Sequence, residues 1–218
     1  MSQEHTFASP GPAGLAALAV ACFGFGAVFL GLVKPGGYPI LAAWLVGGGI
    51  VQIVVAIMEL KDKNLTGGNV FLFFCAFFMF AAALSLMSKF LLLVGAGAFI
   101  PKEAAAASAA AVITWFPKPD PYVEGWCWMA GAAFLTAVTP AYAKSTSLLF
   151  LLVILVDICL WLIVGMDTGW YADPATWKPM VGYMLIFCGW IGIYLAGATV
   201  CNTAYGKSIY YVPKPLVK

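Results

Sequence analysis

The chain has 218 residues, of which 63% are hydrophobic and only 9% charged, and its mean hydropathy is +0.97. A soluble domain carries about 25% charged residues, so the composition excludes one and predicts an all-α integral membrane protein in a lipid bilayer. The net charge of +2 is too small and too dispersed to predict nucleic-acid binding.

Six apolar segments approach the roughly 20 residues that a helix needs to cross a bilayer. Prolines that precede the first segment suit a helix start, because proline is tolerated in the first turn. The expected organisation is a polar tail over 1–13, spans over about 14–33, 39–59, 69–87, 125–143, 147–166 and 180–201, and a polar tail over 202–218.

The longest segment outside these spans is 88–124. Its apolar run over 90–100 is too short to cross a membrane, and an alanine-rich stretch over 102–116 ends in Trp115 and Phe116 before three prolines. We therefore expect a long loop with one short helix lying at the membrane interface.

Lysines flank the spans on both sides, and six spans put both termini on one side. The termini side holds Lys61, Lys63, Lys144, Lys207, Lys214 and Lys218. The other side holds Lys34, Lys89, Lys102, Lys118 and Lys178, spread over much longer loops. We expect both termini in the cytoplasm, the 88–124 loop outside it, and the protein in the cell membrane.

Three polar side chains within the spans are unusual, because lipid penalises a polar group that has no partner. Gln52 and Glu59 lie seven residues apart, about two helical turns, on one face of the second span. Asp157 lies near the middle of the fifth span, where a carboxylate costs roughly 2.5–3.5 kcal/mol. Each either faces a polar path or is satisfied locally, by a bond between helices for Gln52 and Asp157 and by the helix end for Glu59.

Residues typical of enzymes and metal sites are scarce. The six cysteines lie in apolar segments without Cys-x-x-Cys spacing, and the one histidine, His5, lies in the polar tail. We interpret the cysteines as small buried hydrophobic residues. Zinc-protease, serine-hydrolase and nucleotide-loop motifs are absent. The sequence predicts no enzyme, no metal and no cofactor.

Three separated motifs follow one another along the chain. They are Ser9-Pro10-Gly11-Pro12-Ala13-Gly14, then Gly48-Gly49-Ile50-Val51-Gln52-Ile53 followed by Glu59, then Tyr194-Leu195-Ala196 with Val200, Asn202 and Tyr205-Gly206-Lys207-Ser208. In this order they resemble motifs of the acetate uptake transporter family, the succinate–acetate permease group. The resemblance implies a six-helix protomer with a central pore, assembled as a homohexameric ring, that carries acetate or a similar small monocarboxylate with or without a coupled proton.

The resemblance also implies a pore constriction of three side chains, one each from the first, third and fifth spans. By position these are Leu18, Phe74 and Leu155, an apolar ring that would gate partly by dewetting. The polar residues expected along the path are Gln52, Glu59, Asn69, Asp157, Tyr194 and Asn202.

The chain departs from the family pattern near this constriction. Leu18 replaces the usual phenylalanine, Phe74 replaces the usual tyrosine, and Asp157 is an addition. An ionised Asp157 would repel acetate, so we predict either a neutral Asp157 or a different substrate. The competing hypothesis is a structural or accessory membrane subunit that keeps the ring and has lost transport.

Overall fold

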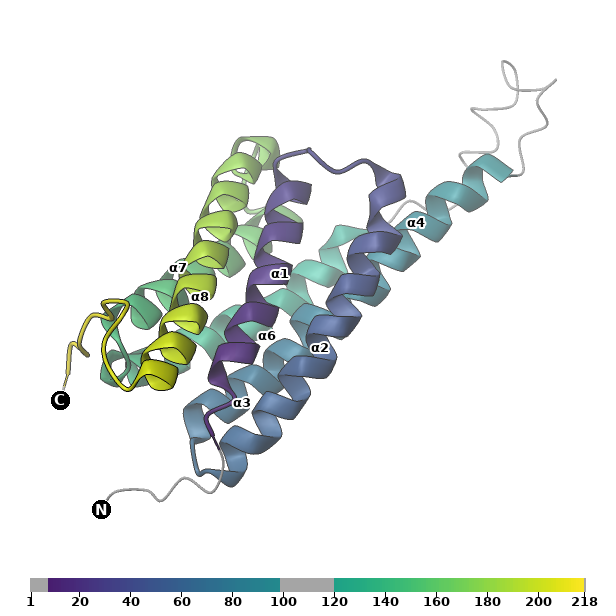
Figure 1. Cartoon of the computed structure of the whole chain (residues 1–218). Coiled ribbons are helices and arrows are strands. Elements are labelled where there is room, and N and C mark those ends of the chain that lie inside the picture. Colours follow the sequence, from purple (N-terminus) through teal and green to yellow (C-terminus); the bar gives the residue numbers. More distant parts are fainter. Residues whose placement is uncertain (1–7, 99–119, 218) are drawn as a thin grey trace, which may run out of the picture.

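The structure is a computed structural model that describes residues 8–98 and 120–217, with side chains through residue 94 in the first part. Six long helical columns run up and down the bundle, and the beginning of α1 and the C-terminal tail lie at the same end (Figure 1). The first two columns are α1 (Gly11–Phe29) and α2 (Tyr38–Lys61). The third is one continuous run of α3 (Leu65–Phe73), a π-helical segment (Phe74–Ala81) and α4 (Ala82–Ala98). The last three are α6 (Pro121–Val138), α7 (Ser147–Asp167) and α8 (Lys178–Tyr205). Three 3-10 turns, Pro35–Gly37, Thr139–Lys144 and Pro174–Thr176, join them.

Within the described residues, five helical stretches are long and apolar enough to cross a membrane. They are Gly11–Phe29, Pro35–Lys61, Leu65–Val94, Ser147–Asp167 and Pro174–Tyr205. Large apolar side chains such as Trp44, Ile50, Phe187 and Trp190 lie exposed on the outside of the bundle, where only lipid solvates them well. The chain is therefore a multi-pass membrane protein with the all-helical, six-helix architecture that the sequence predicts.

Short polar side chains cap the starts of α3 and α7. Asn64 accepts a hydrogen bond from the Gly67 backbone N–H at the start of α3 (3.1 Å), and Thr146 accepts one from Leu149 at the start of α7 (3.2 Å). These caps satisfy backbone donors that lipid cannot satisfy, and they fix where each helix enters the bundle.

The prediction of a loop from residue 88 is wrong at its beginning. α4 continues without a break to Ala98, well past residue 87 where the third span was expected to end. The apolar run 90–100 is too short to cross by itself, but no proline separates it from the helix before it, and its leucines favour continuation of that helix. Figure 1 shows α4 projecting beyond the neighbouring helices. The interfacial helix expected within 102–116 lies outside the described residues.

Helices α1 and α8 make the most extensive contact of the described helix pairs. A Cβ on Gly26 would lie 2.9 Å from the Gly182 carbonyl oxygen, and a Cβ on Gly182 would lie 3.0 Å from the Gly26 carbonyl oxygen. The two glycines let the backbones touch, as small residues do in membrane helix packing.

Replacing Gly182 by Ala is expected to destabilise the bundle by about 1–3 kcal/mol, because the new methyl group meets backbone that cannot move aside. The measurement is thermal unfolding of purified protein in detergent. Gly197→Ala is the matched control in the same helix, since a Cβ there meets nothing within 4 Å. Equal melting temperatures for the two variants would contradict the close approach of α1 and α8.

Candidate functional site

A cavity of about 590 Å³ opens at the end of the bundle that holds the chain termini, and we call it the near cavity. Its mouth lies between the α2–α3 turn and the α6–α7 turn, and carries Glu59, Asn64 and Lys144. From there it reaches inward to Leu18, near the middle of α1, and to Phe74, at the start of the π-helical segment. The cavity is large enough to hold a small organic acid together with water.

The inner end of the near cavity is apolar and tightly packed. Leu18, Phe74 and Val156, from α1, the π-helical segment and α7, are only 7%, 4% and 2% exposed. Leu18 and Phe74 thus lie where the constriction is expected. Leu155 does not, because the α7 residues on the cavity wall follow one helical face and the neighbouring Val156 belongs to it. That face consists of Leu149, Leu152, Val153 and Val156.

Gln52 lines the same cavity and is fully buried, at 0% exposure. Neither its amide oxygen nor its amide nitrogen has a hydrogen-bond partner among the described residues. A buried amide left unpaired costs about 1–3 kcal/mol, so a hydrogen bond from water or a ligand in the cavity would be favourable. The amide atoms are themselves buried, so such a partner needs a shift of the neighbouring side chains to reach them.

Glu59 also lies where the sequence predicts, on the cavity wall near the mouth. Its carboxylate is 8% exposed and accepts a hydrogen bond from the Asn64 side-chain amide at 2.5 Å. Gln52 and Glu59 thus lie on the same cavity, one beside the constriction and one beside the mouth.

Asp157 lies away from the near cavity, between α6 and α7. The Thr136 hydroxyl is 3.0 and 2.9 Å from its two carboxylate oxygens, and the Trp161 indole N–H donates to the Thr136 oxygen at 2.9 Å. This arrangement corresponds to the interhelical bond that was the alternative to a path-lining role. Asn69 likewise does not reach the cavity, since its amide donates to the Leu65 carbonyl of its own helix at 2.8 Å.

Tyr194 and Asn202 hold the C-terminal tail against α8 and do not line the near cavity. The Tyr194 hydroxyl donates to the Tyr211 carbonyl at 2.6 Å. The Asn202 side-chain oxygen accepts from the backbone N–H groups of Ile209 and Tyr210 at 2.7 and 2.8 Å, and its amide donates to the Tyr210 carbonyl at 2.9 Å. The third motif therefore organises a turn after the last helix.

A second cavity, of about 300 Å³, lies at the opposite end of the bundle, and we call it the far cavity. Phe78 and Trp128 form its inner end, in edge-on contact with ring centroids 5.0 Å apart. Phe78 also stacks on Phe74, at 4.9 Å and an interplanar angle of 13°. The stacked pair Phe74–Phe78 separates the two cavities. The outer end of the far cavity carries Lys89, Glu124, Asp167 and Lys178.

Sequence reasoning missed Phe78, Trp128 and Val156 as residues of the axis. The spacing of Phe74 and Phe78 was an available signal, but the π-helical turn that carries both rings has no clear sequence signature. Such turns occur often at functional sites.

Comparison with solved structures agrees with the fold expected from the motifs. The chain matches the structure of the bacterial acetate channel SatP with a TM-score of 0.69 and 18% sequence identity, over 95% of this chain and 99% of that chain. No family model and no curated protein matches the chain by sequence. At this identity the match shows the fold, so the resemblance inferred from the motifs is confirmed at the level of the fold.

Replacing Asn202 by Ala is expected to release the C-terminal tail, because it removes three hydrogen bonds worth about 1 kcal/mol each. Limited trypsin digestion measures this at the Lys207–Ser208 bond, which lies in the tail. Cleavage should accelerate severalfold, as expected when local opening governs proteolysis. Asn69→Ala, a variant on α3, is the control and should leave the cleavage rate unchanged. An unchanged cleavage rate for Asn202→Ala would contradict the role of Asn202 as an anchor of the tail.

Proposed function

We propose that the protein is a channel or transporter for acetate or a similar small monocarboxylate. The observation that carries the proposal is the unpaired amide of Gln52, fully buried in the near cavity beside an apolar constriction. An amide that has no partner among the described residues can form a hydrogen bond with one polar group of a ligand. The structural match to the bacterial acetate channel SatP adds support.

The near cavity has the chemistry of a site for one carboxylate on a short apolar body. Lys144 at the mouth offsets the negative charge of Glu59 there, and the Gln52 amide nitrogen can donate to a carboxylate oxygen further in. The methyl group would then rest against Leu18 and Phe74. A dicarboxylate would press its second charge against the same apolar side chains, where an unpaired charge is strongly disfavoured.

Passage would require the ligand to cross the apolar barrier between the cavities. The side chains of Leu18, Phe74 and Val156 leave the inner end closed, and Phe78 and Trp128 lie beyond them. An apolar constriction of this kind holds water poorly and admits a small, weakly hydrated solute more readily than a strongly hydrated one. Motion of the side chains at this constriction would set the rate at which the ligand passes, with or without a coupled proton.

We further propose a homohexamer in the cell membrane with cytoplasmic termini, so that the near cavity opens to the cytoplasm. Lysine placement supports the orientation. A shallow apolar groove between α1 and α2 supports close helix contact with a neighbouring copy, because small side chains line most of it. It includes Ala13, Ala16, Ala17, Ala43, Gly47 and Gly48.

Purified protein in liposomes is expected to take up radiolabelled acetate in a saturable way at pH 5.5 and 7.5. Formate and propionate should suppress the uptake because each places one carboxylate on a small apolar body, whereas succinate should suppress it weakly. A proton-linked mechanism would show uptake driven by an imposed pH gradient. Uptake equal to that of empty liposomes, from protein that remains intact, would instead favour the structural or accessory subunit.

Replacing Gln52 by Met is expected to reduce acetate uptake about tenfold, which corresponds to losing a hydrogen bond of roughly 1.4 kcal/mol. The melting temperature should stay level or rise, because the change removes an unpaired amide from the interior. Thr199→Val is the matched control, since Thr199 bonds only to the Leu195 carbonyl of its own helix among the described contacts and lies off the cavity. Equal uptake by the two variants would exclude Gln52 from the path.

A further inference from the structure

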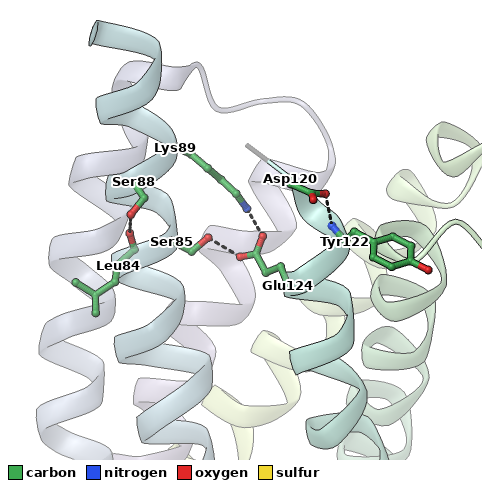
Figure 2. A network of polar contacts seen from close by, with 7 residues as sticks. All are labelled: Leu84, Ser85, Ser88, Lys89, Asp120, Tyr122 and Glu124. Atoms are coloured by element: carbon green, nitrogen blue, oxygen red, sulfur yellow. Dashed lines mark hydrogen bonds and ion pairs between the residues drawn. The ribbon is translucent and has the colours of Figure 1, made fainter. Parts of the chain in front are cut away.

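The Glu124 carboxylate at the far cavity is held by two donors from one helix face. Lys89 donates to Oε2 at 2.6 Å, and the Ser85 hydroxyl donates to Oε1 (Figure 2). Ser85 and Lys89 lie four residues apart on α4 and therefore project from the same side of the helix. Glu124 comes from the first turn of α6. Each carboxylate oxygen thus has one donor.

This cluster forms part of the wall of the far cavity and is partly exposed. Ser85, Lys89 and Glu124 all line that cavity. The Lys89 and Glu124 side chains are 34% and 25% exposed. The backbones of α4 and α6 approach each other little here, so these side chains bridge the space between the two helices (Figure 2). A small solute in the cavity can therefore reach the donors.

We propose that Ser85 and Lys89 form a binding site for a small monocarboxylate at the outer end of the far cavity, and that Glu124 occupies it as a tethered competitor. The inference rests on the proposed function for the identity of the ligand. A hydroxyl and an ammonium group, one on each oxygen, form a charge-assisted arrangement that suits any carboxylate. Glu124 is such a carboxylate attached to the chain, and a free acid can take the same two hydrogen bonds.

Exchange between Glu124 and a free acid requires that Glu124 can leave. A partly exposed ion pair contributes little net stability, so its opening leaves the bundle folded. A second lysine, Lys178, lines the same cavity and offers the released carboxylate another cation nearby. The far cavity is lined by two positive side chains, Lys89 and Lys178, and two negative ones, Glu124 and Asp167. Their charges cancel, so an entering anion meets no net repulsion.

The test measures acetate binding to the purified full-length protein by saturation-transfer NMR. A Gln52→Met background weakens the contribution of the near cavity about tenfold, and all variants are compared in that background. Lys89→Met should weaken acetate binding about tenfold, the loss expected for one charged hydrogen bond. Glu124→Gln should tighten it about three- to tenfold, because the uncharged side chain competes less well for Lys89. Chloride should compete poorly, because a single sphere cannot use two donors as a carboxylate does.

Two matched variants separate a built site from simpler explanations. Asp167→Asn removes the same charge from the same cavity as Glu124→Gln and should change acetate binding little. Ser88 lies next to Lys89, and its hydroxyl donates to the Leu84 carbonyl of its own helix at 2.8 Å. Ser88→Ala should therefore leave acetate binding unchanged. If Glu124→Gln and Asp167→Asn tighten acetate binding equally, both act through the net charge of the cavity, and the proposed site is overturned.

The outcomes also separate this site from the proposed function. Acetate binding that depends on Lys89 and Glu124, in a protein without acetate flux, supports the site and refutes transport. Saturable flux with binding that is the same in all variants overturns the site and leaves transport standing. A lower melting temperature for Lys89→Met with unchanged acetate affinity would show that the cluster only joins α4 to α6, and would also overturn it.

Discussion

Lipid offers no partner to a polar group, and this constraint explains most of the described structure. The starts of α3 and α7 carry side-chain caps, Asn64 and Thr146. Asp157 in the middle of α7 is matched by Thr136 from the neighbouring helix. Gln52 is the informative exception, because its amide has no partner in the described residues and faces a cavity. In an apolar medium such an exception marks the place where water or a ligand belongs.

The same constraint gives the bundle axis its division into three parts. Polar groups lie at the two ends, around Glu59 in the near cavity and Glu124 in the far cavity. The middle is closed by packed aliphatic and aromatic side chains. The Phe74–Phe78 stack is central to that closure. A solute would exchange hydrogen bonds at each end and lose them in between. This favours a ligand with one polar group and a short apolar body.

The charged residues at the far cavity connect two features that sequence reasoning treated separately. The continuation of the third column into α4 carries Ser85 and Lys89 to the end of the axis, and the early start of α6 brings Glu124 to meet them. A loop beginning at residue 88 would have left Lys89 without a fixed position. The helical extension thus turns a loop lysine into part of a cavity wall.

The sequence by itself determined the class of protein and the number of helices, because apolar length is a local property, although it ended the third column too early. The family resemblance indicated Leu18 and Phe74, and Gln52 and Glu59 stand out as polar residues on one face of a single apolar segment; the structure places all four on the wall of the near cavity. Tertiary structure decided the rest. Whether Leu155 or Val156 faces the cavity depends on the rotation of α7 about its own axis, which packing against α6 and α8 sets. Whether Asp157 lines a path or bonds to Thr136 depends on which helix lies beside it, and no local pattern contains that information.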